Sequence, residues 1–277
     1  MKAIITSVLI FIGFQTLFAQ NGQFLETNGV KIYYEIHGNG EPLLLIHGGT
    51  VSGKFWEPWI DDLSQDHMLI VPDVRGHGNS TNPTQIWTMR EVAKDMYSLM
   101  DHLGIHNFNA MGQSGGAMTL LHMATSDTTR ISNMIIVAGA SYFPEESREI
   151  QRNVSYETIN AEWMDTMVEL HPGGEQQIRS LLSQFSAMGD NYDDMNFTPP
   201  YLSTISCPTL IIHGDRDPYF PVHIAVEMYE AIPNSFLWIV PNDGHHPADF
   251  YGRSDSVFSN ALYKTVDNFF AGKWSKN

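Results

Sequence analysis

Six continuous apolar runs, each followed by a loop, constrain the fold of this chain more than any other feature. They are PLLLIHGG (42–49), HMLIVPD (67–73), NFNAMG (107–112), NMIIVAGA (133–140), TLIIHGD (209–215) and FLWIVPN (236–242). A run that is apolar throughout, rather than at alternate residues, is typical of a strand buried on both faces of a largely parallel sheet. Helical stretches lie between several of these runs, and this alternation predicts an α/β domain.

Two local signals add elements to this pattern. The stretch FLETNGVKIYYEIHG contains two extended runs around Asn28-Gly29, which is a hairpin signal. The stretch TMRE at 88–91 is a capping-box pattern, in which the Thr88 side chain reaches forward and the Glu91 side chain reaches back. Apolar residues at helical spacing follow it and predict a helix: Val92, Met96, Leu99, Met100 and Leu103.

One segment, from about Tyr142 to Tyr201, interrupts the alternation of strands and helices. It contains no convincing strand, and its apolar residues recur at helical spacing: Ile159, Trp163, Met167 and Leu170, then Ile178, Leu181, Leu182 and Phe185. So long an interruption is rarely a plain loop. We therefore predict a helical lid at 142–201 between two parts of one core, at 20–141 and 202–277. The alternative is a set of extra crossover helices.

The N-terminus has the pattern of a secretory signal peptide. Lys2 precedes an apolar run from about Ala3 to Phe14, and the small residue Ala19 stands where cleavage is expected. We expect residues 1–19 to be removed, so that an exported, periplasmic or secreted chain begins near Gln20. The alternative, a membrane anchor, needs about 20 apolar residues. Polar residues interrupt this run, so no stable membrane insertion is expected after cleavage.

Composition limits the possible partners. The formal charge is −16, from 15 basic and 31 acidic residues, so a nucleic acid would be repelled. The single cysteine, Cys207, allows no intramolecular disulfide and is interpreted as a small buried hydrophobe. The histidines show no metal-ligand spacing, and no phosphate-binding glycine loop is followed by Lys, so we expect neither metal nor cofactor. The oligomeric state stays open.

Residues 110–118, AMGQSGGAM, place Ser114 between Gly112 and Gly116. The preceding residues read as a strand and the following ones as a helix. Glycine tolerates positive φ and close approach of backbones. A strand-to-helix turn this tight would expose the serine to solvent or to a pocket.

Reactive groups follow four of the predicted strands, where ligands bind in open α/β sheets. These groups are HGG at 47–49, Ser114, Asp215 or Asp217, and His245 or His246. A serine hydroxyl needs an imidazole to take its proton, and the imidazole needs a carboxylate to fix its tautomer. A tetrahedral oxyanion needs N–H donors that already point at it. Gly49 and Gly115 are the candidates for these donors.

With these motifs, the chain resembles the α/β-hydrolase superfamily of lid-bearing serine hydrolases and esterases, from about Gly29 to Phe270. The resemblance rests on GQSGG, LLLIHGG, VPDVRGHGNS, CPTLIIHGDRDPYFPV and PNDGHHP. It implies an α/β-hydrolase fold: a mostly parallel eight-stranded sheet flanked by helices, with a small helical lid. The family's acid lies in a G-x-x-D context and its histidine follows a glycine. These contexts match Asp217 and His245, which leaves Asp215 as a turn cap and His246 as a loop histidine.

We therefore expect an exported serine hydrolase that cleaves a small-to-medium carboxylic ester through an acyl-enzyme. Ser114 is the predicted nucleophile, His245 the general base and then acid, and Asp217 the orienting carboxylate. Gly49 and Gly115 form the predicted oxyanion hole. The alternatives are a lactonase, a prolyl aminopeptidase, a C–C bond hydrolase, or a ligand-binding sensor without turnover.

The remaining polar residues of these motifs receive structural roles. The resemblance suggests that His47 holds the oxyanion loop and that His77 shapes its own loop. Asp73 and Arg75 are predicted to form a structural ion pair. Four residues of the predicted lid either line an apolar pocket or pack between helices: Trp163, Met164, Met167 and Met188.

Overall fold

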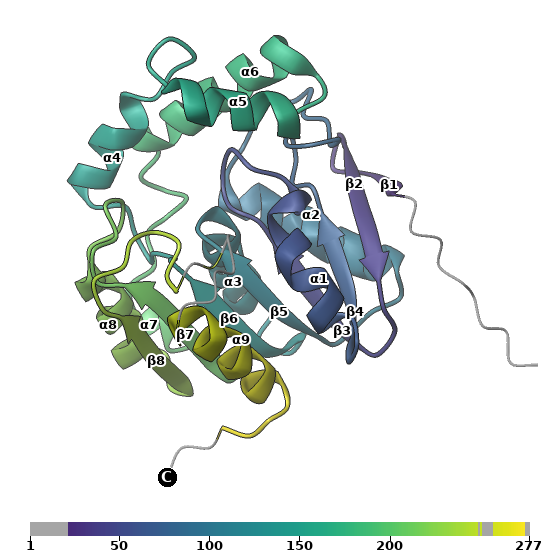
Figure 1. Cartoon of the computed structure of the whole chain (residues 1–277), viewed down its shortest axis with the longest axis vertical. Helices are drawn as coiled ribbons and strands as arrows, with labels where there is room; N and C mark the ends of the chain where they lie inside the picture. The colour runs from purple at the N-terminus through teal and green to yellow at the C-terminus, as the bar shows by residue number, and fades with distance from the viewer. Residues whose placement is uncertain (1–21, 249, 251–256, 275–277) are drawn as a thin grey trace, which may run out of the picture.

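The computed structural model describes residues 22–248, 250 and 257–274, which form an eight-stranded sheet with helices on both faces (Figure 1). The spatial order of the strands is β1-β2-β4-β3-β5-β6-β7-β8. Their bounds are Gln23–Thr27, Val30–His37, Glu41–Ile46, His67–Pro72, Phe108–Gln113, Ile131–Val137, Thr209–Gly214 and Ser235–Val240 for β1 to β8. Strand β2 is antiparallel to β1 and β4, and the other pairs are parallel. The predicted mostly parallel eight-stranded sheet flanked by helices is confirmed.

Side chains of successive strand residues enter two separate cores. On β3, Leu44 and Ile46 belong to one buried cluster, whereas Leu43 and Leu45 belong to the other. Each apolar run therefore has a partner layer on both sides, which explains why these runs do not alternate.

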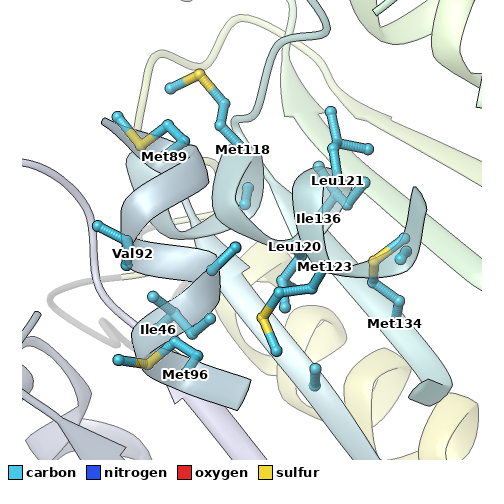
Figure 2. Packing of buried hydrophobic residues seen from close by; sticks show 14 of the residues in the cluster. Ile46, Met89, Val92, Met96, Met118, Leu120, Leu121, Met123, Met134 and Ile136 are labelled. Atoms are coloured by element: carbon cyan, nitrogen blue, oxygen red, sulfur yellow. The ribbon is translucent and has the colours of Figure 1, made fainter. Parts of the chain in front are cut away.

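The two cores are covered by different helices. The first lies under α2 (Met89–His102), α3 (Gly115–Ser126) and α8 (Val222–Ala231), and the second under α1 (Glu57–Leu63) and α9 (Val257–Phe270). Figure 2 shows α2 and α3 contributing Met96, Leu120 and Met123 to the packing with Ile46 of β3.

The predicted hairpin and helix start are present. The two-residue turn between Thr27 and Val30 has positive φ at Asn28 (47°) and Gly29 (74°), as a type I′ turn requires. At the start of α2, the Thr88 hydroxyl accepts a hydrogen bond from the Glu91 N–H at 3.1 Å. Cys207 is buried as expected, and burial raises the pKa of its thiol to about 11.

The segment 142–201 is helical, as its periodicity predicts. It contains α4 (Glu145–Arg152), α5 (Ala161–Leu170), α6 (Gly174–Ala187) and the 3-10 turn η2 (Met188–Asp190), and the short α7 (Pro199–Leu202) begins within it and ends one residue beyond it. Helices α4, α5 and α6 lie together at one end of the molecule, away from α9 (Figure 1). Another 3-10 turn, η1 (Gly53–Trp56), precedes α1.

Buried polar contacts fasten this helical insertion. The Arg148 guanidinium, 3% exposed, donates to the carbonyls of Phe143, Gly189 and Asn191. Near the end of the insertion, the Asp194 carboxylate accepts the N–H groups of Met89 (2.7 Å) and Arg90 (3.1 Å) at the start of α2. The insertion is therefore joined to the core at a helix terminus whose N–H groups have no partner within the helix.

The predicted ion pair between Asp73 and Arg75 is wrong. The Arg75 guanidinium instead binds the Asp95 carboxylate of α2 with two bonds of 2.7 and 2.8 Å. The Asp73 carboxylate accepts the N–H groups of Gly53 and Asn79, both at 2.7 Å. Arg75 and Asp73 therefore bind different partners, although only one residue separates them in the sequence.

The predicted signal peptide, residues 1–19, lies outside the described residues. Within the described part of the chain, no helix combines the length and the apolar character needed to cross a bilayer.

Candidate active site

Ser114 occupies a strained turn between β5 and α3. Its φ of 51° and ψ of −117° form a combination that non-glycine residues rarely adopt and that concentrates at functional sites. The Ser114 N–H donates to the Val137 carbonyl of the neighbouring strand β6 at 2.9 Å, and its carbonyl accepts the Met118 N–H at 3.0 Å. The surrounding backbone therefore holds the serine in this conformation.

The glycines beside Ser114 permit this turn. A Cβ on Gly116 would lie 2.0 Å from the Ile46 carbonyl oxygen, and one on Gly112 would lie 2.5 Å from the backbone of Gly116. No side chain fits at either distance. Strand β3, strand β5 and helix α3 can therefore approach each other only because both positions are glycine, as predicted.

Asp217 lies behind His245 at the end of β7. The His245 Nδ1 is 2.8 Å from the Asp217 Oδ2, and the other carboxylate oxygen accepts the N–H groups of Tyr219 and Phe220. Burial alone would raise the pKa of the fully buried Asp217 carboxyl. The hydrogen bond and charge of His245, together with the Tyr219 N–H, outweigh burial and lower this pKa below its ordinary value. The group is therefore a carboxylate near neutral pH.

Asp215, the rival acid, faces a different partner. Its Oδ1 accepts the Asp243 N–H at 3.3 Å, which is the turn-capping role expected of it. His246 lines the same cavity as His245, and its ring lies 6.1 Å from that of Phe55.

Two buried polar residues beside the site were not predicted. The His213 ring is 0% exposed; its Nε2 lies 2.9 Å from the Phe220 carbonyl and 3.7 Å from the Asp217 Oδ2. Burial lowers the pKa of this imidazole, so it supports the acid loop as a neutral donor. The Gln113 amide donates to the His245 carbonyl at 3.4 Å. The sequence signal for His213 is a polar residue directly after the apolar run Leu210–Ile212, and Gln113 is marked by its place directly before Ser114.

Two buried histidines hold the peptides of residues 47–50, the predicted oxyanion loop, which contains Gly49. The His47 Nδ1 binds the Gly48 carbonyl at 2.7 Å, and its Nε2 accepts the Val74 N–H at 3.0 Å. The His77 Nε2 accepts the Thr50 N–H at 3.1 Å. Burial lowers the pKa of His47 to about 3 and that of His77 well below its ordinary value. Both rings are therefore neutral, as their acceptor roles require.

These contacts bear on which N–H groups can serve an oxyanion. Because C=O and N–H point in opposite directions across a trans peptide, the bond from His47 to the Gly48 carbonyl directs the Gly49 N–H away from His47. The Thr50 N–H is already engaged by His77. Gly115 is the first residue of α3, where N–H groups have no partner within the helix. A Cβ on Gly115 would lie 3.3 Å from the Gly49 nitrogen, so the two candidates are close.

A cavity of about 560 Å³ brings these groups together. Ser114, His245, Gly49 and Gly115 all line it, and Asp217 lies behind His245. Apolar side chains form much of the remaining wall: Trp87, Met89, Met118, Leu182, Phe185 and Met188. Met89 and Met118 lie at the same end of α2 and α3 (Figure 2).

The insertion contributes part of the cavity wall. Trp163 and Met188 line it, whereas Met167 is fully buried in a cluster between the helices of the insertion. Met164 packs against that cluster. Of the four residues, Trp163 and Met188 therefore line the apolar pocket, whereas Met164 and Met167 pack between helices.

Comparisons with known proteins agree with this architecture. The sequence profile of the alpha/beta hydrolase fold family matches residues 41–187 and 165–250. The serine hydrolase BPHL of Mus musculus is 28% identical over 231 residues, which cover 79% of this chain and 78% of the relative. A 2-hydroxy-6-oxo-6-(2'-aminophenyl)hexa-2,4-dienoic acid hydrolase of Metapseudomonas resinovorans is 22% identical over 265 residues, 86% of this chain and 90% of the relative. The solved structure of an enol-lactonase from Burkholderia xenovorans superposes with a TM-score of 0.71 at 20% identity, over 90% of this chain and all of that one.

Proposed function

Because the chain belongs to the α/β-hydrolase family, we propose that it is a serine hydrolase that cleaves a carboxylic ester through an acyl-enzyme. One observation carries this proposal. Ser114 and His245 line one cavity, and the Oδ2 of the buried Asp217 carboxylate lies 2.8 Å from the Nδ1 of His245. A carboxylate in this position keeps the proton on Nδ1, so that Nε2 can act as a base.

The proposed reaction has two halves. The Ser114 Oγ attacks the ester carbonyl carbon while the His245 Nε2 takes the hydroxyl proton. The Gly49 and Gly115 N–H groups stabilise the oxyanion that forms. As the intermediate collapses, His245 passes the proton to the departing alkoxide and leaves an acyl group on Ser114. A water molecule, deprotonated by His245, then attacks the acyl carbonyl carbon. The bond to the Ser114 oxygen breaks, His245 returns the proton to that oxygen, and the carboxylic acid is released.

The cavity wall favours an uncharged ester of modest size. Among the described residues that line it there is no lysine or arginine, and Glu162 is the one carboxylate. A carboxylate buried against the apolar wall would lose its hydration without gaining a cationic partner. We therefore infer that the acyl and alcohol groups are neutral and largely apolar.

The decisive experiment is labelling with a fluorophosphonate followed by an ester, lactone and amide panel. One label is expected per chain, on Ser114, and Ser114→Ala abolishes both labelling and turnover while leaving the circular dichroism spectrum unchanged. A carboxylate-bearing ester is expected to react at least about tenfold more slowly than its neutral isostere. Labelling at another residue, or an active Ser114→Ala protein, contradicts the assignment. Stoichiometric binding without repeated turnover would indicate a sensor.

Export is part of the same proposal and rests on the sequence of residues 1–19. The expected mature chain begins near Gln20. Intact mass of the protein recovered outside the cytoplasm measures this N-terminus. A full-length chain confined to the cytoplasm contradicts it.

A further inference from the structure

Thr50 has an unusual backbone conformation directly after the proposed oxyanion donor Gly49. Its φ is 65°, and for a β-branched residue a positive φ is a genuine outlier. Such strain persists only where the surrounding structure over-determines it, and it concentrates at functional sites. Thr50 is nearly buried, lines the cavity, and lies outside the predicted triad.

Three hydrogen bonds hold Thr50 in this conformation. Its N–H donates to the His77 Nε2 at 3.1 Å, and its hydroxyl donates to the Gly49 carbonyl at 2.7 Å. The same hydroxyl oxygen accepts the indole N–H of Trp163 at 3.3 Å. The first two bonds fix both ends of the Gly49–Thr50 peptide. The third comes from α5, in the insertion.

Trp163 thus makes contact with two parts of the site at once. Its side chain is part of the cavity wall, and its N–H reaches the loop that carries Gly49. A substrate group that packs against the indole would restrict its position and with it the bond to Thr50. Because Thr50 also holds the Gly49 carbonyl, such a restriction is transmitted to the neighbouring oxyanion donor.

We propose that Thr50 is a positioning residue that couples Trp163 of the insertion to the oxyanion loop, so that the distal part of the substrate improves transition-state stabilisation. This inference rests on the proposed ester hydrolysis. Binding energy from a remote group that is used only in the transition state raises kcat, whereas uniform binding lowers KM alone. The prediction is therefore that kcat, and not only KM, increases as an ester becomes long enough to reach Trp163.

The test uses a series of esters with one leaving group and acyl chains of increasing length. Trp163→Phe keeps an aromatic ring but loses the N–H donor, and Thr50→Val keeps the branched shape but loses the hydroxyl. Trp163→Phe loses one bond and is expected to lower kcat for the longest effective ester about three- to tenfold, the usual effect of one neutral hydrogen bond, so that kcat rises less with chain length. Thr50→Val also loses the bond to the Gly49 carbonyl, so it is expected to lower kcat for every ester and to show the same smaller rise with chain length. Thr50→Ser, which keeps the hydroxyl, should retain the chain-length dependence of kcat.

Two further variants distinguish the proposed coupling through Thr50 from a general loosening of the contact between the insertion and the core. The Gln177 amide also joins the insertion to the core, through the carbonyls of Gly76 and Gly78 at 2.9 and 2.8 Å. Gln177→Met is therefore the matched control and should leave the dependence of kcat on chain length unchanged. The double variant Trp163→Phe/Thr50→Val should lose no more than Thr50→Val alone, because both changes remove the same bond.

Independent losses in the double variant, or a Gln177→Met profile as flat as that of Trp163→Phe, overturn the coupling. Failure of this inference differs from failure of the proposed function. In the first case Ser114 is still labelled and esters are still cleaved, with parallel chain-length profiles in all variants. If no ester is cleaved, the proposed ester hydrolysis fails. In that case, the rates at which fluorophosphonates of increasing alkyl length label Ser114 are compared among the same variants in place of kcat.

Discussion

Two carboxylates at the end of β7, two residues apart, have opposite surroundings. Asp217 is fully buried and bound to His245, whereas Asp215 is partly exposed and caps the turn at Asp243. At the scale of the residue, a catalytic role thus depends on the groups that a side chain faces. The GDRD motif contains both aspartates, and the two side chains have the same charge and size.

Asp217→Asn should lower kcat by about 10⁴, because an amide at this position no longer fixes the His245 tautomer. Asp215→Asn, the matched control, should lower kcat less than tenfold. Steady-state kinetics with one activated ester measure both, and thermal melting checks that both variants are folded. The reverse ranking would assign the orienting role to Asp215.

Helix α5 shows how one element serves both packing and the site. Met167 faces Ile178, Leu181 and Leu182, and the four side chains form a buried cluster of the insertion. Trp163, one turn earlier on the same helix, lines the cavity. Residues four positions apart lie on neighbouring parts of a helix surface, so periodicity alone places both on one apolar face.

Met167→Ala should lower the free energy of unfolding by about 2–5 kcal/mol, the usual result of truncating a buried methionine. Its ester preference should match that of the unmodified protein, because its side chain lies outside the cavity wall. Urea denaturation and the acyl-chain series provide the two measurements. An altered chain-length preference with unchanged stability would show that Met167 contacts substrate.

Three buried histidines from distant segments of the chain lie side by side in the folded molecule. The rings of His47 and His77 lie 5.3 Å apart, and those of His77 and His171 lie 6.0 Å apart. They come from the loop after β3, the loop after β4 and the connection between α5 and α6. Burial lowers the pKa of all three below the ordinary value of 6.5. The folded protein therefore keeps His47 and His77 neutral in mildly acidic solution.

Stability should fall as the pH decreases from about 6.5 toward 4.5. In this range His47 and His77 bind protons in the unfolded chain but stay neutral in the folded protein, so acid favours the unfolded state. Each such histidine contributes about 1.4 kcal/mol per pH unit. Urea denaturation at pH 7.5, 6.0 and 5.0 measures the slope, which His77→Gln should reduce and the exposed His106→Gln should not. A flat profile above pH 4.5 would contradict the prediction.

Local patterns in the sequence were sufficient for the framework of this protein. Continuous apolar runs predicted the parallel strands, helical spacing predicted α2 and the insertion, and the glycines around Ser114 predicted the turn. These features depend on residues close in the chain, whose steric and hydrophobic preferences act wherever the segment is placed. Export rests on the same kind of local pattern and remains a prediction.

Contacts between distant segments were decided only by the tertiary structure. The loop after β4 meets α2, which gives Arg75 the partner Asp95 in place of Asp73. Within the insertion, Trp163 lines the cavity whereas Met167 lies in the buried cluster. The bond from Trp163 to Thr50 likewise joins separate parts of the chain. Such pairs depend on how layers and loops meet in three dimensions. A pattern confined to neighbouring residues therefore carries no information about them, because a side chain's partner is set by the geometry of packing.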